Sequence, residues 1–399
     1  MSGNPETRQG AASRILSQRV HKISPSGIRK FFDILNSMED AISLGVGEPD
    51  YATPWHIRES AIYSLEKGYT MYTSNLGMPE LRLEVACYLK ENYGLDYDPQ
   101  SQILITIGAS EAFDLATRAV IDPGDEAILP DPCYVAYDAC VTLAGGIPVP
   151  VPTYQKDGFE LNAADMETRI NKKTKAIVLG YPANPTGAVM PHHKLKQIAE
   201  LALKNNLLVI SDEIYARLVY GVEHTCMASL PGMKDNTVLI GGFSKAYAMT
   251  GWRVGYAAST EEIIAAMTKI HQYTIMSAPT MGQVAAIEAL KSGENDIAEM
   301  TEDYNRRRMV MVGGLREIGL DCFEPKGAFY AFPSIKSTGL SSEQFAEKLL
   351  LEEKVAVVPG NAFGNCGEGY VRCCYATSMA EIEEALNRMR RFVDKYKTD

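Results

Sequence analysis

Residues 241–255 have the sequence GGFSKAYAMTGWRVG and follow directly on the apolar run Val238-Leu239-Ile240. The apolar run predicts a buried strand, so Lys245 lies just past a strand end and is screened from bulk water by the surrounding fold. A desolvated lysine loses its proton more easily, and the neutral amine is a nucleophile that forms an imine with an aldehyde. Ser244 and Arg253 add a hydroxyl and a fixed positive charge, which are groups that hold phosphate.

A nucleophilic lysine, a phosphate grip and a strand end together suggest pyridoxal phosphate as a cofactor. The alternative is that Lys245 is an ordinary solvated loop lysine, because lysine side chains are mostly exposed. Other motifs in the chain have to decide between these two interpretations.

Length and charge set the class of protein. The chain has 399 residues, of which 46% are hydrophobic, enough material for two packed domains. The net charge of -11 and the absence of any basic run beyond Arg306-Arg307-Arg308 disfavour a nucleic-acid-binding surface. That triplet lies in a helical pattern, and we expect it on a solvated face.

The cysteines and the N-terminus indicate the compartment. The eight cysteines form no CxxC motif and share no spacing with histidines, so we expect no metal site and reduced thiols in a cytoplasmic protein. Residues 1–14 are polar, and no segment offers about 18 uninterrupted apolar residues. We therefore expect neither export nor a membrane span.

Short apolar runs alternate with amphipathic segments of helical length from Gln102 onward. Continuous apolarity, rather than alternation, predicts strands that are covered on both faces. This favours an α/β fold with a mostly parallel sheet flanked by helices. The predicted strands are Ile103–Ile107, Ala127–Leu129, Ala176–Leu179, Leu207–Ile210, Val238–Ile240 and Val254–Ala258.

A second, smaller α+β domain is predicted around a long connecting helix over Asp296–Ile318. Its other expected elements are helices at Ile28–Leu35, Ser341–Leu351 and Met379–Tyr396 and strands at Leu44–Asp50, Gly327–Pro333 and Val355–Val358. The expected division is an N-terminal arm over residues 1–14, a small domain from residues 15–50 and 291–399, and a large cofactor-binding domain over residues 51–290.

Polar residues follow the predicted strands at their carboxyl ends, where open parallel sheets bind ligands. Asp212 ends a buried strand, where a carboxylate needs a cationic partner such as a protonated pyridine nitrogen. Tyr215 is then placed to reach the phenolic oxygen of the cofactor. The alternative is that Asp212 is only the N-cap of a following helix.

Four further motifs allow a functional and a structural interpretation. Gly108-Ala109-Ser110 opens a helix whose N-terminus can hold an anion, although a serine there is often only an N-cap. Asn184 stands between two prolines in a rigid turn, and Tyr134 either stacks on the cofactor ring or packs in the core. Arg372 lies in an apolar strand with no obvious carboxylate partner, so a substrate carboxylate is a candidate.

From about Ser24 to the C-terminus, these motifs together resemble the class I aminotransferases, which are pyridoxal-phosphate-dependent enzymes of fold type I. The resemblance implies that Lys245 forms an imine with the cofactor and moves a proton between the substrate Cα and the cofactor C4′. It implies that Asp212 pairs with the pyridine nitrogen and that Tyr134 stacks on the ring. Asn184 and Tyr215 would contact the ring oxygen O3′.

The resemblance also assigns the phosphate and substrate contacts. The residues that would hold the phosphate are Gly108, Ala109, Ser110, Ser244, Arg253 and Tyr72 of the partner subunit, so a homodimer is implied. Arg372, Asn184 and the backbone of Gly47 would bind the substrate carboxylate. One departure is Gly242, where many relatives carry a serine, so one phosphate hydroxyl is missing.

The implied activity is transfer of an amino group between an L-amino acid and a 2-oxo acid. A C–S β-lyase shares nearly every cofactor residue and is an alternative. A regulator that uses the fold as an effector sensor is disfavoured by the acidic charge and by the lack of an N-terminal DNA-binding extension. Because the chain most resembles aminotransferases for aromatic amino acids, with aspartate-preferring enzymes close behind, we expect an aromatic donor and 2-oxoglutarate as acceptor.

Overall fold

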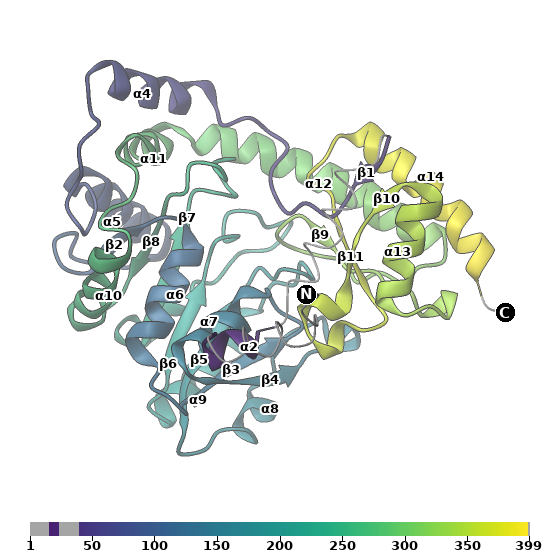
Figure 1. Cartoon of the computed structure of the whole chain (residues 1–399), viewed down its shortest axis with the longest axis horizontal. Coiled ribbons are helices and arrows are strands. Elements are labelled where there is room, and N and C mark those ends of the chain that lie inside the picture. The colour runs from purple at the N-terminus through teal and green to yellow at the C-terminus, as the bar shows by residue number, and fades with distance from the viewer. Residues whose placement is uncertain (1–15, 24–39, 398–399) are drawn as a thin grey trace, which may run out of the picture.

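A seven-stranded sheet forms the centre of the computed structural model, which describes residues 16–23 and 40–397 (Figure 1). The expected arm over residues 1–14 and the expected helix Ile28–Leu35 lie outside the described residues. A smaller C-terminal part lies beside the sheet, and the long helix α12 (Glu294–Glu317) runs from one part to the other (Figure 1). The expected connecting helix over Asp296–Ile318 is therefore confirmed.

The central sheet has the strand order β2-β8-β7-β6-β5-β3-β4. Strand β8 runs antiparallel to both of its neighbours, and the other described pairs are parallel. The prediction of a mostly parallel sheet is thus confirmed. The bounds are β2 Ile103–Thr106, β3 Glu126–Asp131, β4 Ile147–Pro152, β5 Thr174–Gly180, β6 Leu208–Asp212, β7 Thr237–Gly242 and β8 Gly255–Ala258.

Helices cover both faces of this sheet, which explains the continuous apolar runs. On β5, Val178 packs into one cluster and its neighbour Ile177 packs into another on the opposite face. The first face is covered by α6 (Ala109–Val120), α7 (Ala136–Ala144) and α10 (Glu261–Thr274). The second is covered by α4 (Trp55–Glu66), α5 (Pro79–Tyr93), α8 (Ala163–Glu167), α9 (His192–Lys204) and α11 (Thr280–Ser292).

Strand β4 was not among the predicted strands because its sequence, IPVPVP, has proline at every second position. It lies at the edge of the sheet and pairs only with β3. The Ile147 N–H bonds to the Asp125 carbonyl oxygen at 2.8 Å, so the non-proline positions face β3. Proline is tolerated there because an edge strand needs donors on one side only.

The C-terminal part contains α13 (Ser342–Glu353) and α14 (Met379–Tyr396), close to their predicted bounds, and four short strands. These are β9 (Tyr330–Ala331), β10 (Val355–Ala356), β11 (Val358–Pro359) and β12 (Val371–Cys374). The strands expected over Gly327–Pro333 and Val355–Val358 were too long. At Val357 the chain passes from one small sheet to another, because β10 pairs with β1 and β11 pairs with β12.

The N-terminal strand β1 covers Ile42–Ser43, so the strand expected over Leu44–Asp50 is wrong in position. It pairs in parallel with β10 and joins the N-terminal segment to the C-terminal part. The remaining helices are α2 (Gln18–His21) and the 3-10 helices η1 (Gln155–Asp157), η2 (Met227–Ser229), η3 (Lys234–Asn236), η4 (Lys336–Thr338), η5 (Gly360–Phe363) and η6 (Asn365–Gly367).

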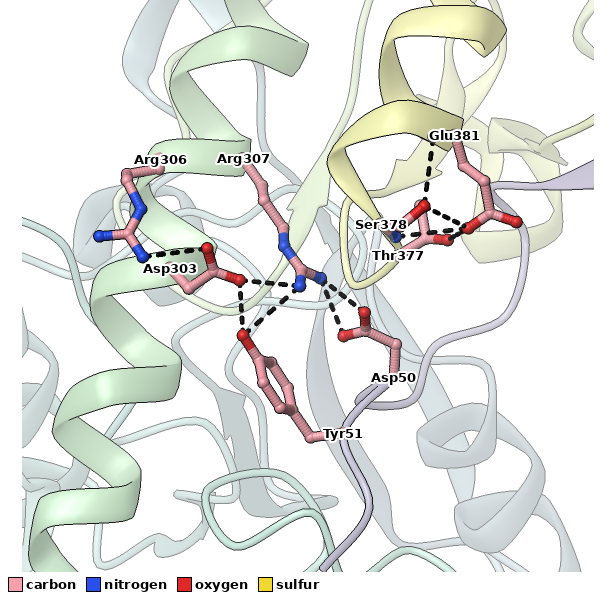
Figure 2. A network of polar contacts seen from close by, with 8 residues as sticks. All are labelled: Asp50, Tyr51, Asp303, Arg306, Arg307, Thr377, Ser378 and Glu381. Carbon is pink, nitrogen blue, oxygen red and sulfur yellow. Dashed lines mark hydrogen bonds and ion pairs between the residues drawn. The ribbon is translucent and has the colours of Figure 1, made fainter.

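The arginine triplet on α12 is not a solvated face, so that expectation was wrong. Arg307 and Arg308 are both buried. Arg307 donates to both carboxylate oxygens of Asp50 at 2.8 Å and lies 2.7 Å from a carboxylate oxygen of Asp303 (Figure 2). The reason is that Arg307 pairs with Asp50 in the segment after β1 and Arg308 donates to the Pro325 carbonyl oxygen at 3.0 Å, so Arg306 alone of the triplet stays exposed.

Candidate active site

A cavity of about 420 Å3 lies at the edge of the central sheet where the parallel strands end. It is lined by all the predicted site residues except Gly108 and Tyr72. The large sheet contributes Lys245 after β7 and Asp212 at the end of β6, and the C-terminal part contributes Arg372 from β12. Residues from opposite ends of the sequence thus meet at one edge of the sheet, as expected for an open parallel sheet.

Lys245 is half-buried, and its Nζ donates to the carbonyl oxygen of Gly47 at 2.6 Å. The amine also lies 5.9 Å from the ring centroid of Tyr215. Burial, with nearby Arg372 and Arg253 acting in the same direction, lowers the pKa of Lys245 to about 8. About a tenth of the amine is therefore neutral at pH 7 and about half at pH 8, and the neutral amine is the nucleophile.

Asp212 is a buried carboxylate with two donors. One oxygen accepts from the Tyr137 hydroxyl at 2.9 Å, and the other accepts from the Ile214 N–H at 3.1 Å. Burial raises the pKa of Asp212 to about 6, although both hydrogen bonds oppose that rise. The chain after Asp212 forms a turn and not a helix, so the interpretation as a helix N-cap does not hold. A cation in the cavity would stabilise the ionised carboxylate.

An anion cradle forms where β2 turns into α6. Gly108 has φ 92°, and a Cβ placed there would lie 2.8 Å from an Nη atom of Arg253. Arg253 donates to the carbonyl oxygens of Thr250 at 2.9 Å and Ile107 at 3.3 Å. The N-cap residue of α6 makes no side-chain cap, so the N–H groups at the start of the helix remain available to an anion.

Gly242, the departure noted in the sequence, is tightly packed. A Cβ at this position would lie 3.0 Å from the Ile214 Cδ1 atom and 3.3 Å from the Cα of Gly255. A serine here would need its neighbours to move. With glycine at this position, the cavity lining still contains Ser244 and the α6 N-terminal residues Ala109 and Ser110.

Among the described residues, Arg372 contacts an amide oxygen and a carbonyl oxygen and no carboxylate. Its guanidinium donates to Asn184 Oδ1 at 2.8 Å and to the Gly45 carbonyl oxygen at 2.7 Å. Its Nε is buried and has no hydrogen-bond partner in the part of the chain that the structure describes. The guanidinium carbon lies 4.5 Å from the ring centroid of Tyr330. A guanidinium with spare donors in a cavity suits a ligand carboxylate.

Two tyrosines that line the cavity, Tyr137 and Tyr330, were not predicted from the sequence as site residues. The Tyr330 and Tyr215 hydroxyls lie 2.6 Å apart, and burial raises the pKa of both. Tyr137, which donates to Asp212, lies on α7 and packs edge-on to Tyr134 with ring centroids 5.6 Å apart. Nothing local marks either residue, because each reaches the site only through tertiary packing.

Tyr72 does not line the cavity of its own chain and is 81% exposed. Its assignment to the site of a partner subunit stays a prediction.

These groups fit pyridoxal phosphate. A buried amine of low pKa suits its aldehyde, a buried carboxylate suits its pyridine nitrogen, and a glycine turn beside Arg253 and a helix N-terminus suits its phosphate.

Among the described residues, no helix combines the length and apolarity needed to cross a membrane. Within the same ranges, no group of three or more histidine, cysteine, aspartate or glutamate side chains is arranged to hold a metal ion.

Comparison with known proteins identifies the family. Residues 39–389 match the family model described as aminotransferase class I and II. The chain is 57% identical over 380 residues to the putative aminotransferase YugH of Bacillus subtilis, covering 95% of this chain and 98% of that protein. It is 45% identical over 385 residues to the aspartate aminotransferase of Pyrococcus abyssi, covering 96% and 99%.

Solved structures agree with these matches. The aromatic aminotransferase from Pyrococcus horikoshii superposes with a TM-score of 0.88 at 44% identity, covering 92% of this chain and 99% of that one. The predicted fold type, the cofactor and the reaction class are therefore confirmed. The chain belongs to the aminotransferase class I and II family, and it is a pyridoxal-phosphate-dependent transaminase that exchanges an amino group between an amino acid and a 2-oxo acid.

Proposed function

We propose that the donor is an aromatic L-amino acid, such as phenylalanine, tyrosine or tryptophan, and that 2-oxoglutarate is the acceptor. The observation that carries this proposal is the charge of the cavity lining. Its described cations are Lys245, Arg253 and Arg372, and each already has a role toward the cofactor or the α-carboxylate. None is left for a side-chain carboxylate, whereas Phe113 and Tyr134 offer apolar contact.

Each residue then has a stated role in the reaction. Pyridoxal phosphate supplies an aldehyde and an electron-withdrawing ring. Lys245 Nζ would hold the cofactor covalently, and as a free amine it would move a proton between the substrate Cα and the cofactor C4′. Arg372 and Asn184, with the backbone of Gly47, hold the α-carboxylate so that Cα faces the lysine. Both half-reactions use this one carboxylate site, which supports a ping-pong route.

The remaining contacts hold the cofactor. Asp212, which accepts a hydrogen bond from Tyr137, would pair with the pyridine nitrogen, and Asn184 and Tyr215 would contact the ring oxygen. Tyr134 would stack on the ring. The residues proposed for the phosphate are Gly108, Ala109, Ser110, Ser244, Arg253 and Tyr72 of the partner subunit.

A second candidate is an aspartate-preferring enzyme, which the similarity to the Pyrococcus abyssi aspartate aminotransferase favours. An aspartate-preferring enzyme must hold the side-chain carboxylate of its substrate in the cavity, whereas an enzyme for aromatic amino acids need not. Glu48 also lines the cavity and accepts from the Thr250 hydroxyl at 3.1 Å. A carboxylate at that wall repels an acidic substrate side chain, which supports the aromatic donor. This argument concerns the donor only: 2-oxoglutarate is proposed as acceptor from the resemblance to the family, and its distal carboxylate meets the same wall.

The test is the ratio of kcat/KM for phenylalanine to that for aspartate, with 2-oxoglutarate as acceptor. We expect this ratio to lie above one and to be no larger than about 10–200, because apolar contact discriminates modestly. Binding alone is checked with hydrocinnamate and maleate as unreactive inhibitors, of which hydrocinnamate should bind more tightly. A ratio that clearly favours aspartate would reject the aromatic donor and leave the transaminase intact. Monocarboxylic 2-oxo acids should also serve as acceptors, since the described lining of the cavity offers no further cation that would favour a second carboxylate.

We further propose a cytoplasmic homodimer. Tyr72, Met71 and Tyr273 are 81%, 79% and 86% exposed, and large apolar side chains left in water often mark an interface. All eight cysteines are free, which suits a reducing compartment.

We also propose the division into a small domain (residues 15–50 and 291–399) and a large domain (residues 51–290). In support, Ile42 and Leu44 share a hydrophobic cluster with α12, α13 and α14.

A further inference from the structure

Glu111 is a nearly buried carboxylate outside the set described above. It lies in the first turn of α6, directly after the Gly108-Ala109-Ser110 cradle. One of its oxygens accepts from the Ile107 N–H at 2.6 Å, and the other lies 2.7 Å from Nδ1 of His271 on α10. The side chain of Glu111 is 9% exposed and that of His271 is 0% exposed.

The Ile107 contact fixes the shape of the turn. Arg253 donates to the Ile107 carbonyl oxygen at 3.3 Å, so Glu111 and Arg253 hold the two peptide groups on either side of Ile107. The Thr106 hydroxyl donates to the Gly108 carbonyl oxygen at 3.0 Å. Because the N-cap residue is a glycine without a side-chain cap, Glu111 is the α6 side chain that ties the helix to the end of β2.

The His271 contact fixes the carboxylate itself. Nε2 of His271 is buried and has no partner among the described residues, so the ring is best satisfied by a single proton on Nδ1, pointing at Glu111. With one oxygen on Ile107 and the other on His271, the carboxylate cannot turn toward the N–H groups of Ala109 and Ser110. Those donors stay available for an anion.

We propose that Glu111 and His271 are positioning residues that hold the cradle for the cofactor phosphate open and correctly shaped. This inference rests on the proposed assignment of Ala109, Ser110 and Arg253 to that phosphate. Neither residue touches the cofactor in this assignment. Their effect should therefore appear in the affinity for the phosphate group and not in the affinity for the rest of the cofactor.

The test compares the dissociation constants of pyridoxal phosphate and of pyridoxal, which lacks the phosphate, for the apoenzyme and its variants. Glu111→Ala should raise the constant for pyridoxal phosphate by about tenfold or more, since a charge-assisted hydrogen bond to the turn is lost. The constant for pyridoxal should stay within about twofold. Glu111→Gln keeps an acceptor for the Ile107 N–H but not for the Nδ1–H of His271, so it should recover most of the loss and not all of it.

The control on the same helix is Asp114→Ala, which removes only a contact with Arg118 on the exposed face, 3.2 Å long. It should change neither constant. His271→Leu should weaken pyridoxal phosphate selectively, and His271→Asn, whose amide N–H can replace Nδ1–H, should recover part of the loss. Far-ultraviolet circular dichroism and the Tm identify any variant that fails to fold, and the Gln and Asn variants then carry the comparison.

Equal weakening of both ligands by Glu111→Ala, or weakening of neither, would overturn the positioning role. Arg253→Gln separates this failure from a failure of the phosphate assignment. If Arg253→Gln weakens pyridoxal phosphate selectively while Glu111→Ala does not, only the role of Glu111 falls. If Arg253→Gln has no selective effect, the phosphate assignment falls, and the inference falls with it.

Discussion

Lys245 owes its reactivity to where the fold places it. Burial of the amine lowers its pKa to about 8. An exposed lysine has a pKa of about 10.4, so at pH 8 it would be almost wholly protonated. Half of Lys245 should therefore be neutral at pH 8, where an exposed lysine would be neutral in well under ~1% of molecules.

We predict that the rate at which the apoenzyme takes up pyridoxal phosphate rises with pH and levels off above about pH 8. The reason is that only the neutral amine of Lys245 attacks the aldehyde. Stopped-flow absorbance between pH 6.5 and 10 would measure this rate. Binding of pyridoxamine phosphate, which has no aldehyde, is the control for ionisation of the phosphate. A rate that keeps rising to about pH 10 would show an ordinary, solvated lysine.

Burial of Asp212 destabilises the folded protein when its carboxylate is ionised. Its folded pKa of about 6 lies above the unfolded value near 3.8, so stability is lost as the pH rises from the unfolded to the folded pKa. The cost is full above about pH 6 and disappears below about pH 4.

We predict that Asp212→Asn makes the apoenzyme more stable at pH 8, by about 1–3 kcal/mol, because the buried charge is removed. Asparagine still offers an oxygen to Tyr137. Urea unfolding at pH 8, 6 and 4 would measure the difference, which should shrink as the pH falls. The variant should also lose most of its activity. Equal stability of the two proteins at pH 8 would mean that Asp212 carries no such cost.

At the scale of elements, α12 both joins the two parts of the molecule and fixes the segment that passes the cavity. Figure 2 shows Arg307 of α12 between Asp50 and Asp303, with the Tyr51 hydroxyl donating to Asp303 at 2.5 Å. The Gly45 and Gly47 carbonyl oxygens, just before Asp50, accept from Arg372 and Lys245. The ion pair between Arg307 and Asp50 therefore holds in place the segment whose carbonyl oxygens accept hydrogen bonds from Lys245 and Arg372.

We predict that Arg307→Ala lowers the free energy of unfolding by about 3 kcal/mol, because it leaves Asp50 and Asp303 without their shared partner. It should also raise KM for both substrates more than it lowers kcat, since the carboxylate-binding groups lose their support. Arg306→Ala is the matched control, because Arg306 is exposed, and its removal leaves the contacts of Arg307 with Asp50 and Asp303 in place. That variant should cost less than about 0.5 kcal/mol. Similar losses in the two variants would contradict the role of Arg307.

The elements that sequence predicts well are those with a local signal. Continuous apolarity predicts most strands of the central sheet, and helical periodicity predicts α14. Strand β4 cannot be predicted in this way, because its prolines are acceptable only at a sheet edge, and which strand lies at the edge depends on the whole sheet. The burial of Arg307 likewise depends on a segment about 250 residues away in the chain.

The same distinction holds in the site. Lys245, Asp212 and Arg372 stand out because a charged residue at or within an apolar run needs an explanation. Tyr137, Tyr330 and Glu111 do not stand out, since each is an unremarkable residue on a helix or strand until packing gives it a partner.

At the scale of the whole molecule, the cavity combines residues from both parts of one chain but leaves Tyr72 outside. The proposed homodimer supplies it across the interface. The Met71 carbonyl oxygen accepts from the Thr280 hydroxyl at 2.7 Å, so the segment carrying Tyr72 is tied to the start of α11 while Tyr72 itself points into solvent. A rigidly anchored but exposed tyrosine suits a contact with a second copy of the chain.

We predict that mixing Lys245→Ala and Tyr72→Ala subunits restores activity. In a hybrid dimer, one site has both wild-type residues: Lys245 from the Tyr72→Ala chain and Tyr72 from the Lys245→Ala chain. Random exchange makes about half of the dimers hybrid, so the mixture should regain roughly a quarter of wild-type activity. The control mixes Lys245→Ala with Asp212→Ala. Lys245 and Asp212 line the cavity of the same chain, so a hybrid site could be intact only if these two residues came from different subunits.

In the control hybrid, one chain lacks Lys245 and the other lacks Asp212, so each site misses one residue and no activity should return. Activity after subunit exchange, measured with phenylalanine and 2-oxoglutarate, separates the two arrangements. If Tyr72 served its own chain, the site with Lys245 would still lack Tyr72, and the first mixture would do no better than the average of its two parents. Sedimentation of the active protein as a monomer would also contradict the shared site.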